Sequence, residues 1–194
     1  MPNWCNNNLT LEHDDPAMIQ RAYDALERGE FLQEFCPVPQ ELKDAVADGS
    51  TNQQLVEKYG YSNWYDYCVN EWGTKWDCGE QGNSDIHPDG RMLHTFFDTA
   101  WAPPVYAYEK LEALGFRVDA QFYEPGMAFA GTYSDGNCDE INLEGLSAND
   151  IERDYPDLDE AFGIAECMRE YEDPEELSEW LKDGVEKKAQ LISL

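Results

Sequence analysis

The feature that most restricts the fold is a pair of alternating segments joined by a short turn. Residues 116–123 (FRVDAQFY) alternate apolar and polar side chains, which is the pattern of a strand with one buried face. Pro125-Gly126 is a turn signal, and residues 127–133 supply the answering strand of a hairpin. The sequence therefore predicts an antiparallel strand pair in the second half of the chain.

The segments before this hairpin predict two further strands, each followed by a helix. Residues 9–12 and 91–101 have strand patterns. Asp15-Pro16 offers a cap for the first helix, and Pro103-Pro104 opens the second, which Gly115 ends. The order β-α-β, a polar insertion and β-α-β-β predicts an α+β fold, in which an antiparallel sheet carries helices on one face.

The composition changes after the hairpin, and this change predicts a second part of the chain. Residues 1–134 are expected to form the α+β core, with a polar insertion near residues 43–90. Residues 135–194 are expected to form an acidic helical extension packed on the core. Ser147 and Asp173 are predicted helix starts. An apolar stripe follows the second start: Leu177, Trp180, Leu181, Val185, Leu191 and Ile192.

The charge of the chain restricts its partners. Asp and Glu number 41 against 13 Lys and Arg, so the formal net charge is −28. Phosphate backbones and anionic lipid surfaces are bound through clustered Lys and Arg, so we expect neither nucleic acid nor membrane as a direct partner. An aromatic content of 13% indicates a folded protein rather than an acidic disordered tail. The acidic surface therefore favours a basic protein partner, or it serves solubility or a high-salt environment.

Five short segments resemble a known family in the same order along the chain. They are residues 1–7 (MPNWCNN), 37–42 (PVPQEL), 70–77 (NEWGTKWD), 97–104 (FDTAWAPP), and 123–126 (YEPG) with 129–131 (FAG). In these segments, which span residues 1 to about 133, the chain resembles the YubB-like ferredoxin-like family. Its members are proteins of unknown function in bacteriophages and conjugative plasmids. The resemblance implies a ferredoxin-like fold and an origin in a mobile element, and it implies no reaction.

The sequence also indicates where in the cell the protein is found and in what state its cysteines are. No apolar run approaches the roughly 18 residues of a membrane span, and the first residues lack the basic and apolar regions of a secretion signal. We therefore expect a cytoplasmic protein of a bacterial host. The six dispersed cysteines are expected to be buried, inert thiols: Cys5, Cys36, Cys68, Cys78, Cys138 and Cys167.

Local motifs for metal binding or catalysis are absent from the sequence. Neither C-x-x-C nor H-E-x-x-H occurs. Residues 85–94 contain two Asp and two His that could gather a divalent ion, but their loop composition favours a solvated turn. Residues 135–146 begin like a calcium loop but lack its Gly and its bidentate Glu. We expect no cofactor, no metal and no catalytic residue. A metal- or thiol-dependent enzyme using the Cys and His residues between 68 and 94 is the alternative.

The tryptophans support a further alternative. Trp64, Trp72, Trp76 and Trp101 could form a stacking platform for nucleobases on a ferredoxin-like sheet. Residues 62–101, however, contain only two cations, too few to hold a phosphate backbone. The tryptophans are therefore expected in the core or on a protein-contact surface, with an RNA-binding module as the alternative.

The acidic extension is the strongest functional feature. Residues 150–179 hold 13 acidic and 2 basic side chains. Helical carboxylates three or four residues apart lie about 5–6 Å apart on one face, so a row from residue 172 to 186 spans about 21 Å and imitates closely spaced phosphates. We predict a nucleic-acid mimic of anti-restriction or anti-CRISPR type that binds the basic surface of a host nuclease or CRISPR effector. The predicted partner-binding residues are Asp150, Glu152, Asp154, Asp157, Asp159, Glu160, Glu172, Asp173, Glu175, Glu176, Glu179, Asp183 and Glu186.

Overall fold

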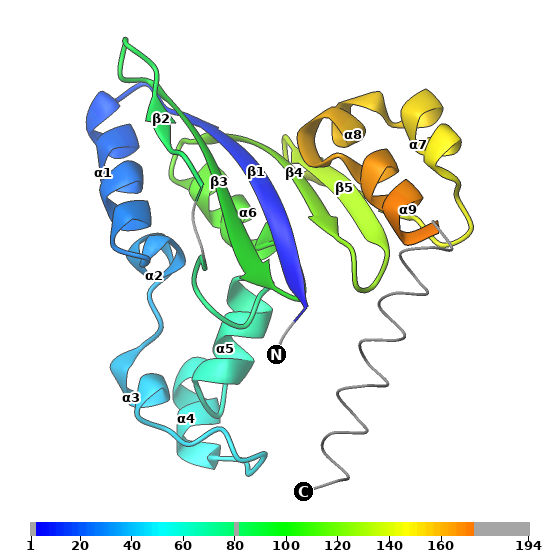
Figure 1. Cartoon of the computed structure of the whole chain (residues 1–194). Helices are drawn as coiled ribbons and strands as arrows, with labels where there is room; N and C mark the ends of the chain where they lie inside the picture. Colours follow the sequence, from blue (N-terminus) through cyan, green and yellow to red (C-terminus); the bar gives the residue numbers. More distant parts are fainter. Residues whose placement is uncertain (1–2, 80–81, 173–194) are drawn as a thin grey trace, which may run out of the picture. The chain divides into compact units, whose positions relative to one another are not determined.

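The computed structural model describes residues 3–79 and 82–172 (Figure 1). The chain divides into two compact units, residues 1–143 and residues 144–194, and each is described by itself. In the described part, no helix has both the length and the apolar composition needed to cross a membrane.

The 1–143 unit is built on a six-stranded antiparallel sheet with strand order β2-β3-β1-β4-β5-β6. The predicted α+β class is therefore confirmed, whereas the finer ferredoxin-like assignment stays a prediction. The elements in chain order are β1 (Trp4–Glu12), α1 (Pro16–Glu27), α2 (Phe31–Phe35), α3 (Gln40–Lys43), α4 (Gln53–Tyr59), α5 (Trp64–Glu71), β2 (Asp85–Ile86), β3 (Met92–Ala100), α6 (Val105–Ala113), β4 (Arg117–Glu124), β5 (Phe129–Ser134) and β6 (Asn137–Asn142).

Strand β1 lies between β3 and β4 and pairs with both in antiparallel register. The side chain of Asn7 holds this strand to β3 from the buried side, where Asn7 is 1% exposed. Its amide donates hydrogen bonds to the carbonyl oxygens of Cys5 (2.9 Å) and Phe97 (3.2 Å) and to the hydroxyl of Thr99 (2.9 Å). Because a buried amide needs such partners, the asparagine in the first segment fixes where β1 meets β3.

Helices α1, α2 and α6 cover one face of the sheet (Figure 1). Helix α1 begins where the side chain of Asp15 accepts a hydrogen bond from the backbone N–H of Ala17 at 2.9 Å, with Pro16 in the first turn. Alternate strand residues and the apolar stripes of the helices meet in one core. Its strand members include Leu9, Leu11, Leu93, Phe97, Val118 and Ala120, and its helix members include Ile19, Leu26, Phe31, Tyr108 and Leu111.

The opposite face of the sheet carries polar side chains that bond across the strands. His94 on β3 lies 2.7 Å from the amide oxygen of Asn8 on β1, whose nitrogen donates to Gln121 on β4 at 2.9 Å. Asn6 donates to Asp98 at 2.7 Å. These contacts join three strands, and His94 takes part in them as a side chain of the sheet.

The described part of the 144–194 unit consists of three short helices. They are α7 (Ala148–Asp154), α8 (Pro156–Phe162) and α9 (Ile164–Glu172). Ser147 and Asp150 form a reciprocal capping box, which confirms the predicted helix start. Gly163 separates α8 from α9 with a φ of 62°, a backbone conformation that glycine adopts without strain. The predicted packing of this extension on the sheet core stays a prediction.

Candidate functional site

The first three residues of the predicted acidic set, Asp150, Glu152 and Asp154, lie on α7, and their carboxylates have partners within the unit. Arg153 bonds to Asp150 at 2.8 Å and to Asp154 at 2.6 Å. Glu152 forms an ion pair with Arg169 of α9 at 2.8 Å. A hydrogen bond from Arg169 lowers the pKa of Glu152, and one from Arg153 lowers the pKa of Asp154. The pKa of Asp150 is also lowered, mainly by its hydrogen bond with the Ser147 side chain. Of these ion pairs, the one between Glu152 and Arg169 joins α7 to α9, whereas those of Arg153 lie within α7.

Helices α8 and α9 carry the other predicted carboxylates that the structure describes. Asp159 accepts a hydrogen bond at 2.7 Å from the backbone near the start of α9, so it has a structural role. Asp157 and Glu160 are exposed on α8. Glu166 and Glu170 are exposed on α9, four residues apart and therefore on one face, although the sequence prediction did not name them.

The remainder of the predicted row is beyond what the structure describes. Glu172 is the last residue of α9, and nothing is described of its side chain. The other members lie outside the described residues: Asp173, Glu175, Glu176, Glu179, Asp183 and Glu186. The row from residue 172 to 186 therefore stays a prediction.

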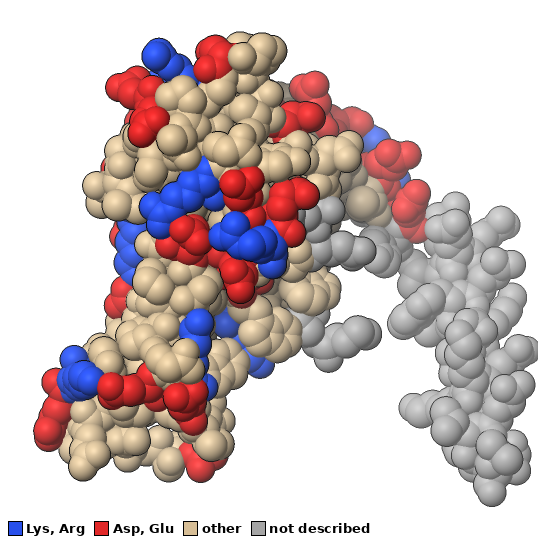
Figure 2. All heavy atoms as spheres, turned by 90° about the vertical axis from the view of Figure 1, so that its left-hand side faces the viewer, with Lys and Arg blue, Asp and Glu red and all other residues tan. Residues whose placement is uncertain are grey.

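Most basic side chains of the 1–143 unit are engaged in ion pairs with carboxylates. On the face shown in Figure 2, Lys and Arg lie beside Asp and Glu and do not gather into one basic area. The pairs are Arg21 with Glu34, Arg28 with Glu30 and Glu34, Lys58 with Glu41, Lys110 with Glu71, and Arg117 with Glu12 and Asp119. The positive charge on this face is therefore neutralised locally, which leaves no array of cations there for a phosphate backbone.

Three tryptophans of the 1–143 unit are exposed, and we call Trp4, Trp76 and Trp101 the tryptophan patch. Their exposed fractions are 39%, 39% and 42%. They come from the start of β1, the loop after α5 and the end of β3, and the rings of Trp4 and Trp76 are 6.2 Å apart. By contrast, Trp72 is buried and Trp64 packs against the core. Large exposed apolar side chains of this kind are enriched at protein-contact surfaces.

The cation of Lys75 lies among these rings. The ammonium of Lys75 is 4.4 Å from the ring centre of Trp76, 5.1 Å from that of Trp101 and 5.7 Å from that of Tyr65. Aromatic faces attract cations at such distances. Lys75 therefore connects two members of the tryptophan patch and shows that these rings accept a positive charge.

The sequence prediction placed Trp64, Trp72, Trp76 and Trp101 in the core or on a protein-contact surface, but it did not include Trp4 and did not say which of them are exposed together. A signal was present. Each member of the tryptophan patch stands in one of the segments that carry the family resemblance, residues 1–7, 70–77 and 97–104. The pairing of β1 with β3 places Trp4 opposite Ala100 and therefore next to Trp101.

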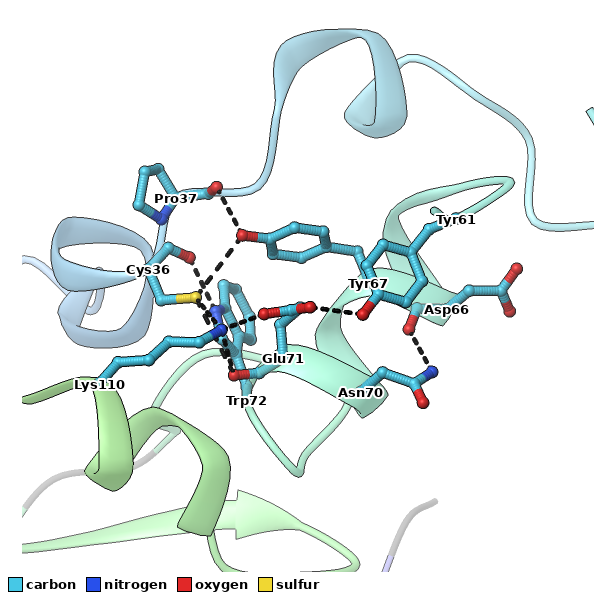
Figure 3. A network of polar contacts seen from close by, with 9 residues as sticks. All are labelled: Cys36, Pro37, Tyr61, Asp66, Tyr67, Asn70, Glu71, Trp72 and Lys110. Carbon is cyan, nitrogen blue, oxygen red and sulfur yellow. Dashed lines mark hydrogen bonds and ion pairs between the residues drawn. The ribbon is translucent and has the colours of Figure 1, made fainter. Parts of the chain in front are cut away.

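A network of polar side chains joins the loop after α2 to α5 and α6 (Figure 3). Lys110 of α6 forms an ion pair with Glu71 and donates to the sulfur of Cys36 at 3.0 Å. Tyr61 donates to the other oxygen of Glu71. Burial favours the neutral form of Glu71, but the hydrogen bonds from Lys110 and Tyr61 outweigh it and lower its pKa. The hydrogen bond to Glu71 raises the pKa of Tyr61 to about 12.

This network predicts a stability effect that depends on pH. We expect Glu71→Gln to lower the free energy of unfolding by about 1–2 kcal/mol at pH 7, because Lys110 and Tyr61 lose a charged partner. Because the pKa of Glu71 is lower in the folded protein than the value of 4.5 in the unfolded chain, its ionised carboxylate stabilises the fold above pH 4.5. This stabilisation is lost as the pH falls through the folded pKa. The difference between the two proteins should therefore shrink below pH 4.5, as measured by urea unfolding. An equal difference at pH 3 and pH 7 would contradict this role, and Glu57→Gln on exposed α4 is the control.

The buried cysteines are held as thiols. Cys5, Cys36, Cys68 and Cys78 are buried, as predicted, whereas Cys138 is exposed and Cys167 is half-buried. Burial raises the pKa of Cys5 and of Cys78, and it raises the pKa of Cys68 to about 12. Because the thiolate is the reactive form, these three side chains are poor nucleophiles and poor metal ligands.

The His and Asp residues between 85 and 94, which the sequence analysis considered as a possible cation site, have other partners. His87 pairs with Asp89 at 3.0 Å, while His94 bonds to Asn8 on the sheet. In residues 3–79 and 82–172, no group of three or more His, Cys, Asp or Glu side chains is placed to hold a metal ion.

Comparisons with known proteins add little to this geometry. No family model matches the chain, and no curated protein matches it. A solved structure, protein api92 from Yersinia pseudotuberculosis, which is described with the family model DUF1281, matches with a TM-score of 0.36 and 20% sequence identity. The match covers 57% of this chain and 38% of that protein, so the chain spans well under half of its length.

Proposed function

We propose that this chain is an acidic protein of a phage or plasmid that inhibits a nucleic-acid-binding defence protein of the bacterial host by occupying its basic surface. It acts in the host cytoplasm as a mimic of nucleic acid, of the anti-restriction or anti-CRISPR type, and uses no cofactor and no reaction of its own. The mobile-element origin rests on the resemblance of residues 1 to about 133 to the YubB-like family.

The observation that carries this proposal is the charge of α7, α8 and α9. Between residues 144 and 172 there are ten Asp and Glu but only Arg153 and Arg169 as cations. Both arginines bond to carboxylates of α7. Exposed carboxylates on α8 and α9, including Glu160 and Glu166, are left to set the surface potential. Net charge of one sign costs self-repulsion, and it also steers an oppositely charged partner at a distance.

The spacing of these carboxylates supports mimicry. Glu166 and Glu170 stand four residues apart on α9, so they lie about 5–6 Å apart on one face. Duplex DNA presents about one charge per 1.7 Å of its axis. A rigid set of carboxylates on three short helices provides closely spaced negative charge without a flexible backbone, which reduces the ordering cost of binding.

The test is inhibition of DNA cleavage by a purified restriction nuclease and by a purified RNA-guided CRISPR nuclease. We expect the full chain to inhibit at least one of them in competition with its DNA. Raising salt from about 50 to 200 mM should weaken inhibition about 100-fold or more if several basic contacts are used. The triple variant Glu160→Gln, Glu166→Gln, Glu170→Gln should weaken inhibition about tenfold and lower the salt slope by about one per charge removed.

The matched control removes the same charge elsewhere. Asp14→Asn, Glu27→Gln and Glu109→Gln are exposed positions of the 1–143 unit, and together they change the net charge by the same amount. This control should inhibit like the natural protein. If both triple variants lose inhibition equally, the effect comes from the net charge of the protein and not from the carboxylates of α8 and α9. Inhibition that does not depend on the salt concentration would overturn mimicry.

A further inference from the structure

A cavity of about 640 Å³ opens in the 1–143 unit beside the tryptophan patch. We call it the Glu140 cavity, and its lining residues are Asn3, Trp101, Met127, Phe129, Glu140 and Asn142. Phe129 of β5 lies opposite Asn142 of β6 and Glu140 is two residues away, so these three side chains share one face of the sheet. The cavity thus combines an indole, a phenyl ring and a thioether with one carboxylate and amide groups.

One carboxylate lines this cavity, and a second lies behind its wall. Glu140 lies on its wall and is exposed. Glu124 lies opposite Phe129 in the sheet, is only 1% exposed, and accepts hydrogen bonds from the backbone N–H groups of Gly126 (3.0 Å) and Met127. In the described residues, Glu124 forms no ion pair with Lys or Arg. A buried carboxylate without a cation attracts one to the adjacent space.

The aromatic wall is held in place by the backbone. Trp101 has a φ of 71°, a left-handed conformation that costs a bulky residue about 1–2 kcal/mol. Its backbone N–H donates to the carbonyl of Asn3 at 2.9 Å, which fixes this conformation next to another lining residue. Its indole lies 5.1 Å from the ammonium of Lys75, so this ring already accepts a cation within the molecule. Strain maintained at an exposed aromatic side chain points to a binding role.

We propose that the Glu140 cavity binds an arginine side chain presented by a basic protein partner. A guanidinium is planar, stacks on an indole and bonds to a carboxylate through two parallel N–H groups, whereas an ammonium does neither. Trp101 supplies the stacking face, Glu140 the carboxylate and Met127 the apolar contact for the stem. The charge of Lys75 repels the guanidinium, whereas Glu140 on the wall and Glu124 behind it attract it. The inference rests on the proposed function in one respect, which is that the partner carries a positively charged surface.

The test compares two capped peptides of equal length and charge, one with two arginines and one with two lysines, titrated into the full chain. The diffuse attraction of a −28 protein acts equally on both, so their difference isolates guanidinium recognition. We expect the arginine peptide to bind about tenfold tighter, with shifts in the Trp101 indole NMR signal. Glu140→Gln should reduce this preference to about twofold. Asp139→Asn is the matched control, because the adjacent β6 residue points to the other face of the sheet.

Each outcome decides the inference. Equal binding of the two peptides, or equal loss in Glu140→Gln and Asp139→Asn, would overturn it. Free methylguanidine binding as tightly as the peptide would make the cavity a small-molecule site instead, and would also overturn it. The triple variant of Glu160, Glu166 and Glu170 should keep the arginine preference, so failure of nuclease inhibition and failure of arginine binding are separate results.

Discussion

Gly131→Ala is expected to destabilise the protein by about 3 kcal/mol, which is at the upper end for overpacking a buried site. A Cβ at Gly131 would lie 2.3 Å from the backbone oxygen of Asp139 and 2.5 Å from the ring of Phe122. The ring could move, but the oxygen belongs to β6 and moves only if β6 separates from β5. We expect the melting temperature to fall by about 6–12 °C, and amide exchange in β6 to become faster.

The neighbouring position provides the control. Thr132→Ala changes the next residue of β5, whose side chain points to the other face of the sheet. We expect its cost to stay below about 1 kcal/mol, the span of strand propensities. A Gly131→Ala protein as stable as Thr132→Ala would show that β5 and β6 approach less closely than described.

Asp77→Ala is expected to cost about 2–3 kcal/mol, because three backbone N–H groups lose their acceptor. The carboxylate of Asp77 accepts hydrogen bonds at 2.8 Å from Leu32 and Gln33 in the first turn of α2 and from Cys78. It therefore caps a short helix from a distant loop and attaches that loop to the core. Asp44→Ala, at an exposed carboxylate bonded to one glutamine side chain, should cost below about 0.5 kcal/mol.

The pH dependence at Asp77 has the opposite sign to that at Glu71. Burial raises the pKa of Asp77, against the three backbone hydrogen bonds that lower it. The folded protein therefore binds this proton more tightly than the unfolded chain. The natural protein should gain stability relative to Asp77→Asn as pH falls through the raised folded value toward 3.8. A relative loss of stability over this range would contradict the burial of the carboxylate.

The elements that were predicted well are those whose signals are local. The alternation of residues 116–123 and the turn at Pro125-Gly126 gave β4 and β5 with small errors at their ends. Asp15 with Pro16, and Ser147 with Asp150, marked helix starts because capping depends on neighbours within one turn. The two-residue strand β2 was not predicted, because its pairing with β3 leaves almost no pattern in so short a segment.

The candidate sites depend on contacts between distant segments, which a single sequence does not reveal. The acidic character of α7 to α9 was evident from composition, but the pairing of Glu152 with Arg169 depends on how two helices pack. The tryptophan patch exists because β1 and β3 place Trp4 and Trp101 at neighbouring strand ends. The burial of Glu124 likewise follows from the β4–β5 turn closing over its carboxylate. None of these pairings has a signature within one segment.

Strand β6 has a consequence for the behaviour of the protein in concentrated solution. It is the last strand of the sheet, and its outer hydrogen-bonding groups have no strand beside them in the described residues. Such an edge is a template for joining sheets from different molecules into fibres. Asp139 and Glu140 stand in the middle of this edge, so two copies meeting side by side would bring like charges about 5 Å apart. We therefore expect the carboxylate that we assign to arginine binding also to oppose the joining of sheets at neutral pH.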